Sequence, residues 1–163
     1  MILDNNLILC GALSAAGVVT GQAMNGAGNV LSTNTVDLGP LALGGNQAAD
    51  VGAGEAIEVV VSILTAPTVG TNVKFQIIQA DDAALTSNVQ VINSTDDIPI
   101  ASLPAGTLVP LHWDRAAPYT PKRYWGLRAV NTGAIATLSV FAAVTKNVQD
   151  IKNLNYKSGF AVL

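Results

Sequence analysis

Charged side chains are scarce in this sequence of 163 residues, since they make up 12% of it against about 25% in an average soluble domain. Hydrophobic residues make up 50%, and 15 glycines come in addition. A monomeric protein needs charge to keep its surface hydrated and its neighbours apart. So little charge favours burial of the surface against a partner, and we expect a protein that packs against other protein subunits.

Basic residues are few, and none precedes Lys74. The net charge of −3 argues against nucleic-acid binding, which needs a basic footprint. The single cysteine, Cys10, rules out an intramolecular disulfide and is interpreted as a small buried side chain. Residues 7–19 are apolar, but no Lys or Arg precedes them and they are shorter than the roughly 20 residues of a membrane span. We therefore expect no export signal and no membrane segment.

Residues suited to catalysis or metal binding are equally few. A Ser-His-Asp or Cys-His arrangement needs a histidine base, and the sequence contains only His112. One histidine and one cysteine cannot complete a zinc site, and the paired aspartates at 81–82 and 96–97 lack the spacing of a calcium-binding loop. We therefore expect no enzymatic activity, no metal and no cofactor.

The first 54 residues are rich in Ala, Gly and Asn, with five glycines between positions 11 and 28. Glycine at this density does not support a regular helix, because each glycine costs about 1 kcal/mol relative to alanine. Residues 1–54 are therefore predicted to form an extended N-terminal arm with one short strand near residues 34–38. A neighbouring subunit would hold such an arm in place.

From residue 55 onward the pattern is typical of strands, beginning with alternating apolar residues at Ile57, Val59, Val61 and Ile63. Further strands are predicted over residues 72–79, 89–92, 98–101 and 107–112, where Pro110 indicates a sheet edge. Residues 123–130 and 135–144 are predicted to form a hairpin closed by a turn at 131–133. About eight strands predict an all-β, jelly-roll-like antiparallel β-sandwich. Residues 55–145 form its core and residues 146–163 a C-terminal tail, within a single domain.

One short stretch, from residue 112 to residue 128, holds both tryptophans, the only histidine, two of three tyrosines and all three arginines. Trp, Tyr and Arg are enriched in the hot spots of protein interfaces. One interpretation is a buried tryptophan pair flanked by solvated charges; the other is a contact surface for an acidic patch on a partner. The candidate contact residues are His112, Trp113, Arg115, Tyr119, Lys122, Arg123, Tyr124 and Arg128.

Three segments resemble the capsid cement proteins of short-tailed bacteriophages, which are also called stapling or decoration proteins. They are the opening MILDNN, the Gly/Ala-rich segment after it, and KRYWGLRAVNTG at residues 122–133. The resemblance covers most of the chain in length and order of elements. It implies a jelly-roll-like homo-oligomer, a dimer in preference to a trimer, made in the bacterial cytoplasm and placed on the exterior of the virion. There it would bridge neighbouring subunits of the major capsid protein, and it would have no catalytic residues.

Two other functions stay open at this point, because one fold hosts many unrelated functions. A carbohydrate- or receptor-binding module on the virion surface would be favoured by a pocket lined with exposed Trp113 or Trp125 and acidic groups. A small jelly-roll enzyme would normally carry several inward-facing histidines, whereas this sequence has one.

Overall fold

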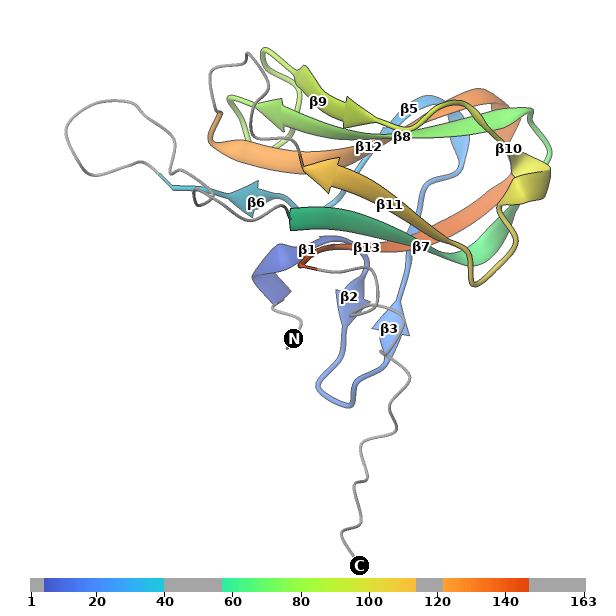
Figure 1. Ribbon diagram of the computed structural model, residues 1–163, viewed down its shortest axis with the longest axis horizontal. Helices are drawn as coiled ribbons and strands as arrows, with labels where there is room; N and C mark the ends of the chain where they lie inside the picture. Colours follow the sequence, from blue (N-terminus) through green and yellow to red (C-terminus); the bar gives the residue numbers. More distant parts are fainter. Residues whose placement is uncertain (1–4, 40–56, 114–121, 147–163) are drawn as a thin grey trace, which may run out of the picture.

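The structure is a computed structural model that describes residues 5–39, 57–113 and 122–146. Strands dominate these residues, beside two short 3-10 helices, η1 (Asn5–Leu7) and η2 (Ile100–Ser102). Two antiparallel sheets pack against each other (Figure 1). The predicted all-β sandwich is confirmed. The C-terminal tail predicted over residues 146–163 lies outside the described residues except for Lys146.

One sheet, which we call the β13 sheet, has five strands and ends at β11, the strand that carries Pro110. Proline has no amide proton to donate to a neighbour, which is why it suits an edge strand. The order along the sheet is β1 (Ile8–Cys10), β13 (Thr137–Thr145), β7 (Ile57–Thr68) and β11 (Leu108–Trp113), with β4 (Gln22–Ala23) also paired to β13.

The other sheet, which we call the β12 sheet, has six strands. Its long central strands β8 and β12 pair over nine residues of β12, from Tyr124 to Thr132. The order is β10 (Ile98–Pro99), β8 (Asn72–Ala80), β12 (Tyr124–Ile135) and β5 (Gly26–Leu31), with β9 (Gln90–Ser94) beside β8 and β6 (Val36–Asp37) beside β12.

Alternate residues of the long strands build the core between the sheets. The alternation predicted from the sequence is confirmed, because these residues are fully buried and belong to one cluster. Burial of each such side chain contributes about 1.5–3 kcal/mol. The core includes Val59, Val61 and Ile63 of β7, Val73, Phe75 and Ile77 of β8, and Leu127 and Ala129 of β12.

The N-terminal segment differs from the predicted extended arm, because residues 5–39 form six short strands of the structure. Strands β1 and β4 pair with β13, while β5 and β6 pair with β12. Leu9, Cys10 and Met24 are fully buried in the core. The glycines exclude a helix but not strands of two to six residues, whose alternation is too short to recognise. The strand predicted near residues 34–38 is confirmed as β6.

The predicted hairpin between residues 123–130 and 135–144 is wrong, because β12 and β13 belong to different sheets. The chain passes from one sheet to the other between Ile135 and Thr137. The supposed turn lies within β12, where the register with β5 shifts between Asn131 and Ile135 and Gly133 has a φ of +83°. The turn-forming residues therefore mark a bulge, which bends a strand without reversing it.

A small hairpin of β2 (Ala12–Leu13) and β3 (Val19–Thr20) projects from the sandwich on the β13-sheet side (Figure 1). The Ser14 amide donates to the Val18 carbonyl at 2.9 Å, and the Val18 amide donates to Ser14 Oγ at 3.0 Å. Gly17, with a φ of +75°, supplies the left-handed residue that this tight turn needs. Val18 is 58% exposed, so the hairpin carries an apolar side chain into solvent.

Candidate partner-contact surface

The described candidate contact residues other than Arg128 lie where β11 ends and β12 begins at Tyr124. His112 and Trp113 close β11, Lys122 and Arg123 lead into β12, and Arg128 lies at its middle. The two remaining candidates from the intervening loop, Arg115 and Tyr119, lie outside the described residues.

The two tryptophans form a buried pair. Their rings stack with centroids 3.8 Å apart and planes 5° apart, and the exposed fractions are 2% for Trp113 and 6% for Trp125. The Trp125 indole nitrogen donates to the Lys122 carbonyl oxygen at 2.7 Å. The prediction that Trp113 contacts a partner is therefore wrong, and the alternative of a core tryptophan pair holds. Neither ring offers an exposed platform for a sugar, so the observation that would favour a carbohydrate-binding module is missing.

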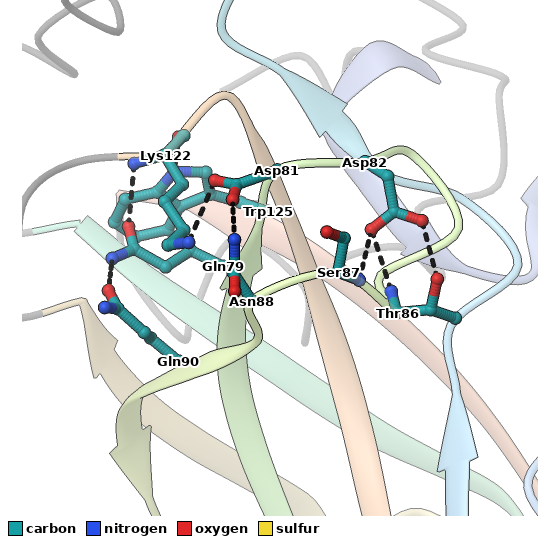
Figure 2. Close-up of polar contacts among 9 residues, drawn as sticks. All are labelled: Gln79, Asp81, Asp82, Thr86, Ser87, Asn88, Gln90, Lys122 and Trp125. Carbon is teal, nitrogen blue, oxygen red and sulfur yellow. Dashed lines mark hydrogen bonds and ion pairs between the residues drawn. The ribbon is translucent and has the colours of Figure 1, made fainter.

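The Lys122 side chain is held by the loop that follows β8 (Figure 2). Its Nζ donates to Asp81 Oδ1 at 2.9 Å, and Asn88 Nδ2 donates to Asp81 Oδ2 at 2.7 Å. These hydrogen bonds, that of Lys122 first, lower the pKa of Asp81. The Lys122 side chain is only 11% exposed. Lys122 therefore ties β12 to this loop.

Buried Gln79 continues this network beneath Lys122 (Figure 2). The Lys122 backbone amide donates to Gln79 Oε1 at 3.1 Å, and Gln79 Nε2 donates to Gln90 Oε1 at 2.7 Å. Leaving the buried Gln79 amide without hydrogen-bond partners would cost about 1–3 kcal/mol. These hydrogen bonds therefore remove that cost. The network joins the ends of β8, β9 and β12.

Asp82 organises the same loop. Its carboxylate accepts from the Ser87 amide at 2.7 Å and from the Thr86 amide at 2.9 Å, and the Thr86 hydroxyl adds a bond at 2.7 Å. These bonds, that of the Ser87 amide first, lower the pKa of Asp82. Asp82 therefore acts within the loop, as short polar side chains commonly do in turns, whereas Asp81 also bonds Lys122 outside it.

Arg123 forms a two-point ion pair with Asp37 on β6. Arg123 Nε donates to Asp37 Oδ1 at 2.7 Å and its terminal nitrogen donates to Oδ2 at 2.8 Å, while its guanidinium lies 4.9 Å from the centroid of the Tyr124 ring. The hydrogen bond from Arg123, followed by that from the Gly39 amide, lowers the pKa of Asp37 to about 2. The same bond raises the pKa of Arg123. The pair fastens the N-terminal segment to the start of β12.

Arg128 and His112 also have neighbours in the chain. Arg128 Nε donates to Gln76 Oε1 at 2.8 Å, and partial burial lowers the pKa of Arg128. The His112 ring is more exposed, at 58%, with its Nδ1 3.9 Å from Glu58 Oε1. Each described lysine and arginine of the candidate surface thus has a polar partner within the chain. The partners Asp37 and Asp81 escape sequence analysis because they lie 86 and 41 positions from Arg123 and Lys122.

The N-terminal segment offers a different kind of surface. No Asp, Glu, Lys, Arg or His occurs from residue 5 to residue 36, yet the tip of the β2–β3 hairpin and residues 27–29 of β5 are exposed. In the sequence, this surface is indicated only by the absence of charged residues from residue 5 to residue 36. Only the structure shows that the segment is folded onto the sandwich while keeping much of its surface in solvent.

Within the described ranges, no three or more His, Cys, Asp or Glu side chains come together as a metal site would require. None of the helices found there has the length and apolar character needed to cross a bilayer.

The described residues form an antiparallel β-sandwich in which Lys74, Lys122 and Arg123 pair with aspartates of other segments. A protein-family model, Bbp16, matches residues 13–145. The chain belongs to the Bbp16 family, which is phage-related. A search of curated proteins found no match.

Proposed function

We propose that this protein is a structural virion protein that binds the exterior of a phage head and cements neighbouring major capsid protein subunits. Membership of a phage-related family supports the link to a virion. The observation that carries the cementing role is the N-terminal segment, which is uncharged over residues 5–36 and nevertheless largely exposed.

An uncharged surface is suited to burial against a protein. Moving an ionised side chain out of water costs several kcal/mol unless it finds a partner, whereas small neutral side chains carry no such cost. The hairpin tip consists of Ser, Ala, Gly and Val, and β5 begins Gly26-Ala27-Gly28-Asn29. Such residues let another backbone approach closely. The projecting hairpin reaches away from the sandwich toward a neighbouring subunit.

Cementing needs no catalytic group. A protein that binds the assembled shell and not the free subunits stabilises the shell by about 2.7 kcal/mol per site at a hundredfold excess over Kd. Many sites on one shell add their contributions. The proposed partners are therefore the major capsid protein and further copies of this chain, without nucleic acid, membrane or cofactor, and the protein is not an enzyme.

Reconstitution tests this function. Shells assembled from the major capsid protein of the same phage are mixed with the purified protein, sedimented, and melted in a calorimeter. Saturable binding at a constant ratio, together with a higher shell melting temperature, is the expected result. A wild-type protein that stays in the supernatant at micromolar concentration would refute the proposal.

Two exposed valines provide a matched pair of variants. Val18 lies at the tip of the hairpin, and Val69 lies in the turn between β7 and β8; their exposed fractions are 58% and 67%. We expect Val18→Asp to weaken shell binding by roughly tenfold or more, because a buried charge costs more than the 1.4 kcal/mol that tenfold represents. Val69→Asp should bind as the wild type does.

A further inference from the structure

We propose that Asn25 is a site of spontaneous deamidation, and that the carboxylate formed there weakens the attachment of this protein to the shell. The second half of this inference rests on the proposed function, whereas the first half is a property of the chain alone. Three observations carry it: the residue that follows Asn25, the exposure of Asn25, and the uncharged segment in which it lies.

Asparagine is a thermolabile residue, above all where glycine follows it. The Gly26 nitrogen loses its proton and bonds to Cγ of Asn25, while Nδ2 takes up a proton and leaves as ammonia. Water then opens the resulting succinimide ring at either carbonyl, which gives aspartate or isoaspartate, so water is the only co-reactant. A side chain on the following residue hinders the attack, and glycine has none. Asn-Gly occurs once in this sequence, at residues 25–26.

The structure leaves this pair accessible to water. Asn25 is exposed and lies between β4 and β5, where the chain crosses from the β13 sheet to the β12 sheet. Among the described residues, and apart from its two chain neighbours, nothing lies within 4 Å of the position that a Cβ on Gly26 would take. Asn25 Nδ2, the nitrogen that leaves, donates to the Ala136 carbonyl at 3.3 Å, which is longer than the usual range of about 2.7–3.2 Å. The reacting amide is therefore only weakly held.

The crossing is held from the inside by Asn131. Nδ2 of this buried residue donates to the Met24 carbonyl at 2.9 Å and to the Gly26 carbonyl at 3.1 Å, on either side of Asn25. Isoaspartate would lengthen the backbone between these two carbonyls by one carbon atom and so strain the grip of Asn131. Aspartate would keep the backbone and change only the charge.

Deamidation brings charge to a segment that has none. No Asp, Glu, Lys, Arg or His occurs over residues 5–36, and the exposed residues 27–29 follow Asn25 almost directly. A carboxylate at position 25 would lose the hydrogen bond to the Ala136 carbonyl and would find no cation in its own segment. Burial of an unpaired carboxylate against another protein is costly. An assembled particle does not replace an altered copy, so the product accumulates and the attachment weakens with age.

Peptide mass spectrometry of the folded protein, incubated at mildly alkaline pH, tests the chemistry. We expect deamidation to appear first at Asn25, as a mixture of aspartate and isoaspartate, and to slow at mildly acidic pH because the attacking nitrogen must lose its proton. Two other asparagines are internal controls. Asn29 is exposed but precedes the branched Val30, and Asn93 Nδ2 donates to the His112 carbonyl at 2.6 Å. The site is refuted if either control is converted before Asn25, or if Asn25 stays intact in the folded protein for as long as its complete conversion takes in urea.

Shell binding of fresh and aged protein tests the consequence, after melting curves have shown that each sample is folded. We expect aged wild type and fresh Asn25→Asp to bind with a Kd raised by roughly tenfold or more. In Asn25→Gln the longer side chain cyclises far more slowly, so its aged sample should bind as its own fresh sample does. Aged wild type that is converted at residue 25 but binds as tightly as before would refute the weakening. If fresh wild type does not bind shells while Asn25 is converted first, the deamidation site stands and the proposed function falls, together with the weakening that rests on it.

Discussion

The indole of Trp113 on β11 stacks on the indole of Trp125 on β12, so a single aromatic contact joins the two sheets of the sandwich. The sequence places these residues among charged and aromatic neighbours, a composition typical of an interface. Their burial assigns the aromatic part of that stretch to the core and leaves its charged part at the rim, where it ties together segments that are distant in sequence.

Truncation of Trp113 should therefore act on stability. We expect Trp113→Ala to lower the free energy of unfolding by about 3–5 kcal/mol, because it removes both the stack and a large buried surface. Trp113→Phe keeps an aromatic ring and should cost clearly less. Urea unfolding followed by circular dichroism measures both, with Val18→Ala as an exposed control expected within about 0.5 kcal/mol of the wild type. A Trp113→Ala protein as stable as this control would contradict the core assignment.

Gly126 makes room for the side chain of Leu85, which packs on the outer face of the β12 sheet with Ile78 and Ala80. A Cβ at position 126 would overlap Leu85 Cδ1 and lie 2.8 Å from Ser32 Oγ, so we expect Gly126→Ala to destabilise the protein by about 1–3 kcal/mol. Combining it with Leu85→Ala, which removes the overlapping Cδ1 without placing a β-branched residue at the positive φ of position 85, should recover part of that loss. A non-additive double-mutant cycle in urea unfolding is the expected sign of this contact, and simple addition of the two losses would exclude it.

Removal of residues 1–28 distinguishes an arm from a core segment. If these residues formed an arm held by a neighbour, as the sequence alone predicts, their removal would weaken attachment to partners more than it lowers the melting temperature of the protein. The structure reverses that expectation, because Leu9, Cys10 and Met24 belong to the core, and β1 to β4 and the first half of β5 would be lost. We expect the truncated chain to lose its cooperative thermal transition. If the truncated chain keeps the wild-type melting temperature, residues 1–28 form an arm and not a part of the core.

The strands from residue 57 onward can be predicted from the sequence, because in a long strand with one buried face apolar residues recur at every second position. Val59, Val61 and Ile63 show this on β7, and Trp125, Leu127 and Ala129 show it on β12. Pro110 likewise locates an edge through its missing amide proton.

Pairing between strands does not follow in the same way. The residues at 131–133 favour a reversal of the chain, but which strand lies beside β12 depends on contacts with β8 and β5, more than 40 residues away in the chain. The short N-terminal strands contain too few residues to display a period. The charged partners of Lys122 and Arg123 are also distant, and no spacing rule connects Arg123 with Asp37.

The ion pair between Asp37 and Arg123 should leave a signature in the acid stability of the protein. Folding lowers the pKa of Asp37 from its ordinary value of 3.8 to about 2, chiefly through the hydrogen bond from Arg123. As the pH falls, the unfolded chain therefore takes up a proton at Asp37 before the folded protein does. The stabilisation is complete above about pH 4, declines as the pH falls toward 2, and is absent below that value.

Asp37→Asn isolates this contribution. The difference in unfolding midpoint between wild type and Asp37→Asn should be constant from pH 7 to about pH 5 and should shrink between about pH 4 and pH 2. In an Arg123→Gln background the main cause of the lowered pKa is gone, so the same substitution should show much weaker acid dependence. Because both side chains are more than 40% exposed, added salt should reduce the effect at neutral pH. A difference that is as large at pH 2 as at pH 7 would mean that the carboxylate charge of Asp37 does not hold β6 to β12.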